Sequence, residues 1–91
     1  MDEQAFEAAL RRDGFSEVLR RAIPPGEALP EHSHAWEVRG LVLAGRFRVE
    51  GEGGLQDCGP GQVFTLPAAA RHTEAAGPEG ADVLIGRKHG G

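Results

Sequence analysis

The chain has 91 residues, a formal net charge of −4 and a pI near 5.5. This length predicts one domain over residues 1–91, with a thin core that a bound metal or a second subunit would stabilise. A mildly acidic chain argues against nucleic acid as a partner, because phosphate binding needs a basic face. The sequence has no apolar run of the ~20 residues that cross a bilayer and no recognisable signal peptide. With a single cysteine, Cys58, we expect a cytoplasmic protein that has no membrane partner.

The N-terminal segment, residues 2–13, is predicted to form a short amphipathic α-helix. Apolar residues such as Phe6 and Leu10 recur at helical spacing, with Glu and Arg on the other side. Acidic residues at its start and arginines at its end suit the helix dipole, and Gly14 stands where a capping glycine would stand. A helix this short does not hold itself in water, so its apolar stripe is expected to pack on another element.

From about residue 16 to residue 87, short apolar or alternating runs are separated by glycine and proline. This pattern predicts an all-β sandwich or barrel. The expected strands are 16–23, 32–35, 38–43, 46–50, 62–66, 71–75 and 81–87. Turns are expected at 24–26, at Ala44-Gly45 as a tight hairpin, at 52–54 and at 77–80. The residues expected to fill the interior are Val42, Phe47, Val49, Val63, Phe64, Leu66, Val83 and Ile85.

Three histidines in the predicted strands are candidate metal ligands. If residues 32–35 form a strand, its period of two directs His32 and His34 to the same face. Two imidazoles aimed at one point suit a divalent transition metal, and His72 from a distant strand would supply a third ligand. An HxH pair by itself is a weak signal, because exposed histidine pairs also occur by chance at strand ends.

The residues around the first two histidines resemble the first motif of the cupin superfamily. That motif is a glycine, five residues, HxH, three or four residues, a glutamate, six residues and a second glycine. In this sequence Gly26 is followed after five residues by His32-Ser33-His34, and Gly45 stands at the place of the second glycine.

The region around the third histidine is similar to the second cupin motif, Gly-x5-Pro-x-Gly-x2-His-x3-Asn. Here Gly61 is followed by Pro67, Ala69 and His72 at those spacings. The resemblance implies a cupin-type jelly-roll β-barrel over about residues 16–87, preceded by the short helix. It also implies a metal site inside the barrel and, commonly, a homodimer, but no single reaction.

The motif glutamate is replaced in this sequence. Its place is taken by Val38, and the other allowed spacing gives Arg39, which cannot ligate a metal. Glu74 lies two residues beyond His72, so a regular strand points both to one side, as in the second metal motif of the pirin branch of cupins. Glu37 would turn inward only if a β-bulge shifted the alternation. The predicted ligands are therefore the three histidines and Glu74, with Glu37 or water as alternatives in the fourth place.

The expected cofactor is one divalent transition metal ion, namely Zn, Fe, Ni, Mn or Cu, since imidazole suits all of them. An open site suits catalysis, so the first hypothesis is a small-molecule metalloenzyme, isomerase-like or dioxygenase-like. The alternatives are a non-catalytic module that binds or senses a small molecule, and a barrel with a purely structural metal. A homodimer is expected because small barrels have edge strands to cover.

Several other residues have two interpretations each. Trp36 walls the mouth of the barrel or packs in its core. Arg39 and Arg71 orient an anionic substrate or form surface ion pairs. Cys58 is interpreted as a small residue beside a turn. The basic cluster at residues 87–89 is interpreted as solvating the chain end, with His89 disordered.

Overall fold

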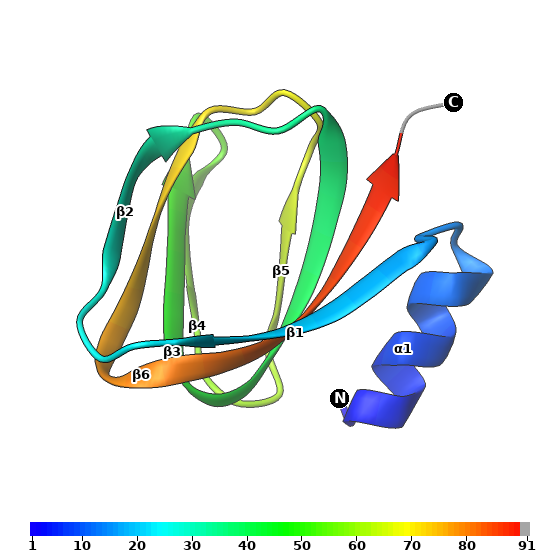
Figure 1. The fold of residues 1–91 in the computed structure, drawn as a ribbon, viewed down its shortest axis with the longest axis horizontal. Helices are drawn as coiled ribbons and strands as arrows, with labels where there is room; N and C mark the ends of the chain where they lie inside the picture. Colours follow the sequence, from blue (N-terminus) through cyan, green and yellow to red (C-terminus); the bar gives the residue numbers. More distant parts are fainter. Residues whose placement is uncertain (90–91) are drawn as a thin grey trace.

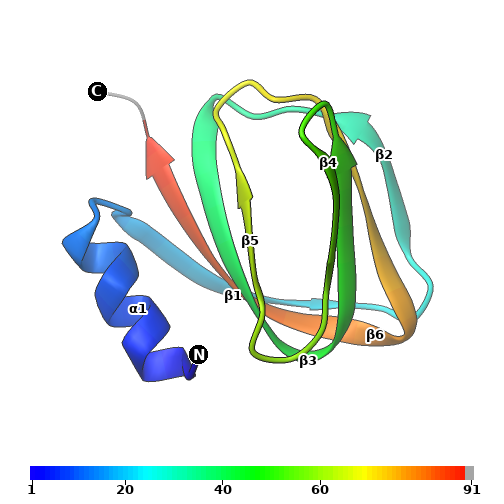
Figure 2. The same cartoon turned by 180° about the vertical axis from the view of Figure 1, so that it is seen from behind.

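A computed structural model describes residues 1–89 and shows one short helix followed by six strands in that part of the chain. The expected all-β fold with an N-terminal helix is confirmed. The elements are α1 (Glu3–Arg12), β1 (Glu17–Ile23), β2 (Ala28–His32), β3 (Trp36–Gly51), β4 (Gly54–Cys58), β5 (Val63–Leu66) and β6 (His72–His89). The strands curve around a common interior, and α1 lies outside it (Figures 1 and 2).

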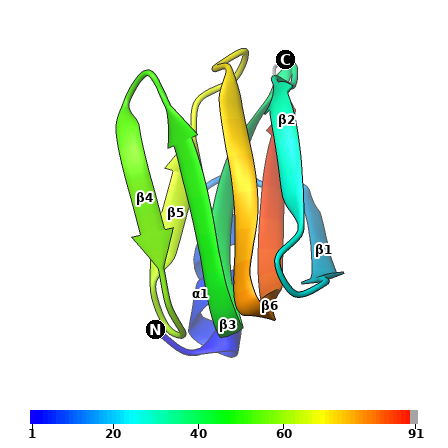
Figure 3. The ribbon, with the colours of Figure 1, turned by 90° about the vertical axis from the view of Figure 1, so that its left-hand side faces the viewer.

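The long strands β3 and β6 pair antiparallel along nearly their whole length and bend together, so each belongs to both walls of the barrel. In one wall, residues 72–76 of β6 lie between β2 and the second half of β3, which also pairs with β4. Figure 3 shows β4, β3, β6 and β2 side by side in this wall. In the other wall, residues 81–87 of β6 pair with β1 and with the first half of β3, which also pairs with β5.

The predicted turns at Ala44-Gly45 and at residues 77–80 are wrong. Both segments lie inside long strands, where they bend β3 and β6 without reversing them. The register of the pair shifts between Val42 and Ala44 and again between Gly45 and Phe47. Gly45 has φ +76, and a Cβ added there would lie 2.1 Å from the Gly80 carbonyl oxygen. Glycine therefore signals a close approach of two bent strands here, a use that a sequence cannot distinguish from a tight turn.

Two other boundaries differ from the prediction. The second strand runs from Ala28 to His32 and ends where the sequence pattern places its start. Residues 54–58 form β4, which the sequence pattern does not predict because the segment has few apolar residues and follows the glycines at 51, 53 and 54. The turn at residues 52–54 is found as expected, connecting β3 to β4.

The barrel interior holds most of the predicted apolar residues. Val63 is the exception, with 39% of its surface exposed, because its neighbour Phe64 takes the inward position and a strand alternates. The interior cluster consists of Ile23, Val38, Val42, Phe47, Val49, Cys58, Phe64, Leu66, Ala76, Ala81, Val83 and Ile85.

A second apolar cluster lies between α1 and the outer face of the sheet, as the amphipathic stripe predicts. Phe6, Leu10 and Phe15 pack there against Leu41 of β3 and Leu84 of β6. The helix begins at an N-cap, Asp2, whose Oδ1 accepts a hydrogen bond of 2.8 Å from the backbone N–H of the helix residue three positions on. No helix in residues 1–89 is long and apolar enough to cross a membrane.

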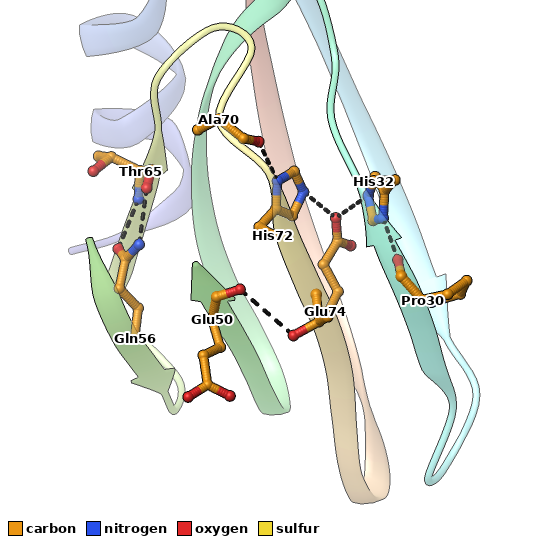
Figure 4. Close-up of polar contacts among 9 residues, drawn as sticks. Pro30, His32, Glu50, Gln56, Thr65, Ala70, His72 and Glu74 are labelled. Atoms are coloured by element: carbon orange, nitrogen blue, oxygen red, sulfur yellow. Dashed lines mark hydrogen bonds and ion pairs between the residues drawn. The ribbon is translucent and has the colours of Figure 1, made fainter. Parts of the chain in front are cut away.

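Strands β4 and β5 face each other across a gap that one side chain bridges. The Gln56 amide donates a hydrogen bond of 2.8 Å to the Thr65 carbonyl, and its Oε1 accepts one of 2.9 Å from the Thr65 backbone N–H (Figure 4). The side-chain amide thereby takes the place of backbone hydrogen bonds between two strands and links β4 to β5. Above this bridge, a cleft of about 680 Å³ opens between the 52–54 turn and the loop of residues 67–71.

Candidate metal centre

Four potential ligands converge at one end of the barrel. His32 ends β2, His72 begins β6, and the register of the two strands sets these residues opposite each other. Glu74 follows on β6, and His34 comes from the loop between β2 and β3. One ligand atom from each residue lies within 4.8 Å of the others. For comparison, metal–ligand bonds of ~2.1 Å place tetrahedral ligand atoms about 3.4 Å apart, so modest adjustment would bring this set around one ion.

Glu74 lies at the centre of the group. Its Oε2 is 2.9 Å from Nε2 of His32 and 2.9 Å from Nε2 of His72 (Figure 4). His72 is 2% exposed and Glu74 is 8% exposed, so this contact is shielded from water. A buried carboxylate costs free energy unless a hydrogen-bond donor or a positive charge offsets it.

Two backbone carbonyls orient the same two rings. His32 Nδ1 lies 2.7 Å from the Pro30 oxygen, and His72 Nδ1 lies 2.9 Å from the Ala70 oxygen. Because a carbonyl only accepts, each Nδ1 carries the proton and donates, which leaves the Nε2 lone pair directed at Glu74. Two lone pairs and a carboxylate oxygen then meet at one place, an arrangement that attracts a proton or a metal cation.

His34 completes the group from a loop and not, as predicted, from a strand shared with His32. Its ring centroid is 5.1 Å from that of His32 and 5.0 Å from that of His72, and it stacks on Trp36 at 5.0 Å with an interplanar angle of 16°. Burial lowers the pKa of His34, and the positive charge that His72 and His32 can carry lowers it further. A lowered pKa keeps the ring neutral, which is the form that binds metals.

The structure does not bring Glu37 into this group. Val38 is 5% exposed and packs in the barrel core, so the apolar residue at the usual glutamate position faces inward. The register of β3 stays regular until Val42, and the bulge that Glu37 would need is absent from this part of the strand. Glu37 therefore lies on the opposite face from Val38, where it is paired in register with Lys88 of β6.

Arg39 and Arg71 form ion pairs away from the histidines. Arg39 Nη1 donates to Asp13 Oδ2 at 2.7 Å, which lowers the pKa of that carboxyl, and its guanidinium lies over the Phe15 ring. Arg71 pairs with Glu31. The surface ion-pair interpretation thus describes both.

The prediction of disorder at His89 is wrong. His89 ends β6 opposite Trp36, and its Nε2 lies 3.0 Å from Glu17 Oε1, a contact that lowers the pKa of Glu17. Cys58 lies beside a turn as expected, but it ends β4 and is buried, and this burial raises the pKa of its thiol.

Two residues beside the group, Arg21 and Arg87, are not among the predicted site residues. Together with His34, Glu74 and apolar side chains they line a cavity of about 20 Å³ in the barrel interior. The period of two in their strands is the signal that could have found them, since each lies two residues from an inward apolar residue. The interpretation of Arg87 as part of a solvated chain end is wrong, because Arg87 lies within β6 and lines this cavity.

Residues 19–85 match the family model described as "Cupin domain". The chain belongs to the cupin family. This cupin resembles a protein of unknown function from Rhizobium leguminosarum, at 25% identity and TM-score 0.75 over 80% of this chain and 69% of that one. It also resembles an RmlC-like cupin from Shewanella frigidimarina, at 19% identity and TM-score 0.70 over 80% and 65% of the two chains.

A longer structure is also similar. The W96Y oxalate decarboxylase of Bacillus subtilis is 26% identical with TM-score 0.70, and the match covers 89% of this cupin but 24% of that chain. This cupin therefore spans about a quarter of that enzyme and about two thirds of the two smaller proteins. No curated protein sequence matches it. The comparisons show the family and the fold, and the cupin carries a group of three histidines and one glutamate that is compatible with a divalent metal.

Proposed function

We propose that this cupin binds one divalent transition metal ion through His32, His34, His72 and Glu74 and acts on a small molecule at that ion. The observation that carries the proposal is the convergence of four ligand atoms within 4.8 Å, with two imidazoles oriented by backbone carbonyls. The ring orientation matters because metal-binding histidines typically donate their other ring N–H to a carbonyl or carboxylate in this way.

The chemistry of the donor set fits such an ion. Three imidazoles and one carboxylate suit Zn, Fe, Ni, Mn or Cu. When bound, the ion would act as a Lewis acid on an oxygen-bearing group of the substrate. Glu74 would offset part of its positive charge, the Pro30 and Ala70 carbonyls would hold two rings in place, and Trp36 would fix the plane of His34. We propose a metalloenzyme of the isomerase-like or dioxygenase-like type.

Metal analysis combined with calorimetric titration tests the site. Each of the five metals is titrated into metal-free protein, and at least one is expected to bind with a stoichiometry of one ion per chain. His72→Ala should weaken this binding by more than the roughly 10–100-fold that is lost when a group that only orients a ligand is removed. His89→Ala is the matched control, because this fourth histidine lies outside the group. The metal affinity of this variant should equal that of the wild type. If no metal binds stoichiometrically, the proposal is wrong.

A specific observation favours a second function, the non-catalytic binding or sensing of a small molecule. Phe47 and Phe64 pack in the barrel with ring centroids 5.2 Å apart, and the cavity beside the metal group holds only about 20 Å³. The interior therefore leaves little room for a substrate pocket. The metal-loaded protein is screened against sugar acids and diketones for product and, in parallel, for thermal shifts. Saturable stabilisation without product supports the sensing function, whereas product with any metal supports the enzyme.

Chelation separates both functions from a purely structural metal. His32 is 31% exposed at its side chain, and none of the four candidate ligands belongs to the apolar interior cluster. We therefore expect the metal-free protein to stay folded, with a thermal midpoint that falls but a retained β-sheet circular dichroism spectrum. Unfolding upon chelation would establish the structural role instead.

We also propose a homodimer, since the chain is short and Leu55 and Val63 expose apolar surface. Analytical ultracentrifugation tests this proposal, and monomer alone at micromolar concentration would contradict it.

A further inference from the structure

Two arginines occupy inward-facing strand positions where the neighbouring residues are apolar. On β1, Leu19 and Ile23 pack into the barrel core, and Arg21 lies between them on the same face because a strand alternates with a period of two. On β6, Val83 and Ile85 are buried, and Arg87 occupies the next position of that row. Both arginines are only partly buried, and the Arg87 side chain is 27% exposed, so each guanidinium lies between the interior and the solvent.

Neither inward arginine is fully paired within the described part of the chain. Arg87 lies over the Trp36 ring at 5.0 Å, and its Nη1 is 3.7 Å from Glu17 Oε1, which is too long for a hydrogen bond. Arg21 forms no ion pair or hydrogen bond with any residue from 1 to 89. Arg20 beside it points the other way and is paired with acidic side chains. Both inward guanidiniums therefore keep N–H donors free.

These free donors line the same cavity as His34 and Glu74, which belong to the metal group. The cavity has room for about one water-sized group, so an oxygen of a ligand enters it while the rest of the ligand lies toward the mouth. A further buried donor lies close by, because Nε1 of Trp36 has no hydrogen-bond partner and the indole contacts both His34 and Arg87. Unused N–H donors of Arg21, Arg87 and Trp36 are thus gathered at this end of the interior.

We propose that Arg21 and Arg87 bind a carboxylate group of the small molecule that meets the metal, so that the ligand is a small organic acid. The inference rests on the proposed function, since it names the ligand class of that site. The planar N–H fork of a guanidinium matches a carboxylate and forms charge-assisted hydrogen bonds with it. A neutral ligand would bring no negative charge to these two guanidiniums, of which Arg21 has no acidic partner in residues 1–89 and Arg87 has only the 3.7 Å pair with Glu17.

Trp36, the single tryptophan of the chain, provides a fluorescent reporter of this site. Metal-free protein is titrated with acetate and glycolate, and separately with acetamide and glycolamide, at constant ionic strength set with chloride. We expect a saturable change in Trp36 emission with the carboxylates and none with the amides, which have nearly the same shape without the charge. Equal changes in Trp36 emission with the acids and the amides, or a change that does not saturate, would overturn the proposal without any variant being needed.

Variants then locate the binding site. Arg21→Gln and Arg87→Gln are each expected to weaken acetate binding about tenfold or more, because each removes a charge-assisted hydrogen bond. Arg20→Gln, which removes the same charge from the outer face of β1, is the matched control and should leave the affinity close to that of the wild type. Calorimetry is used for Arg87→Gln, since this substitution alters the surroundings of Trp36. If Arg20→Gln weakens binding as much as Arg21→Gln, the attraction is general and the proposal is wrong.

The metal arm of the experiment separates this inference from the proposed function. The acetate titration is repeated with Zn²⁺ added and with His72→Ala, whose metal affinity is measured independently. Saturable acetate binding that depends on Arg21 supports the arginine site even where Zn²⁺ fails to bind. Stoichiometric Zn²⁺ binding without any acetate response would overturn the arginine site and leave the metal site standing.

Discussion

The two faces of the bent β3–β6 pair carry two buried clusters of different character. The outer cluster, under α1, consists of Phe6, Leu10, Phe15, Leu41 and Leu84 and contains no polar side chain. The inner cluster is apolar in the middle but ends in His72, Glu74 and the inward arginines. The same strands therefore present one face that can only stabilise the fold and one whose end is polar enough to bind ligands.

This difference separates the outer cluster, which stabilises the fold, from the polar end of the inner cluster, which costs stability. Helix α1 lies outside the barrel (Figure 1), so it covers apolar surface without blocking the end that holds the histidines. Buried polar residues such as Glu74 contribute less to folding than apolar ones of similar size, because their desolvation must be offset by partners. Substitutions in the two clusters should therefore affect different measurements.

The largest effect on stability is expected in the outer cluster. Leu10 is fully buried between α1 and the sheet, so Leu10→Ala should lower the free energy of unfolding by about 3 kcal/mol through lost burial and a cavity. Chemical denaturation of the metal-free protein measures this loss. Metal affinity of the folded protein should not change, and a parallel loss of metal binding would show that the two clusters are coupled.

A somewhat smaller effect is expected from restoring the missing carboxylate. Val38→Glu places a glutamate at the usual cupin position, facing the interior next to the metal group. In metal-free protein this buried carboxylate should lower the free energy of unfolding by about 1–3 kcal/mol. Added metal should recover that loss, and the double variant Val38→Glu/Glu74→Gln should bind metal more tightly than Glu74→Gln alone. Equal affinities of those two variants would show that residue 38 does not reach the ion.

Glu74→Gln tests how much of the metal affinity depends on charge. The amide keeps the shape of the side chain but offers a weaker ligand and no negative charge to the two imidazoles at 2.9 Å. Affinity should fall about 10–100-fold. Glu31→Gln, an exposed acid outside the group, serves as the control in the same calorimetric titration. Unchanged affinity of Glu74→Gln would mean that the three histidines suffice.

The smallest effect concerns pH and the edge of the outer cluster. The hydrogen bond from Arg39 lowers the folded-state pKa of Asp13 below its ordinary value of 3.8, so the ionised carboxyl stabilises the fold above that value. This contribution is lost as the pH falls from about 4 through the lower folded-state pKa. The thermal midpoint of Asp13→Asn should therefore approach that of the wild type below this window. The effect should be small because the pair is at the surface, and a difference that stays constant as the pH falls to about 2 would contradict it.

Much of the candidate site could be predicted from local sequence. His72 and Glu74 are two residues apart in a strand, so their common face follows from the backbone period alone. Val38 at the motif position and its inward direction also follow from alternation. The position of His34 could not be predicted this way, because His34 lies in a loop after the end of β2. The backbone of a loop follows no repeating pattern from which a side-chain direction can be inferred.

The sequence by itself determined the short amphipathic helix, the all-β fold, most of the interior residues and the common face of His72 and Glu74, because each depends on spacing within one segment. Only the tertiary structure decided that Gly45 and Gly80 bend two long strands, that Arg21 and Arg87 line one cavity, and that His32 and His72 lie opposite each other. These features depend on strand pairing between residues far apart in the chain. Register is set by the packing of the whole barrel, and no local pattern specifies it.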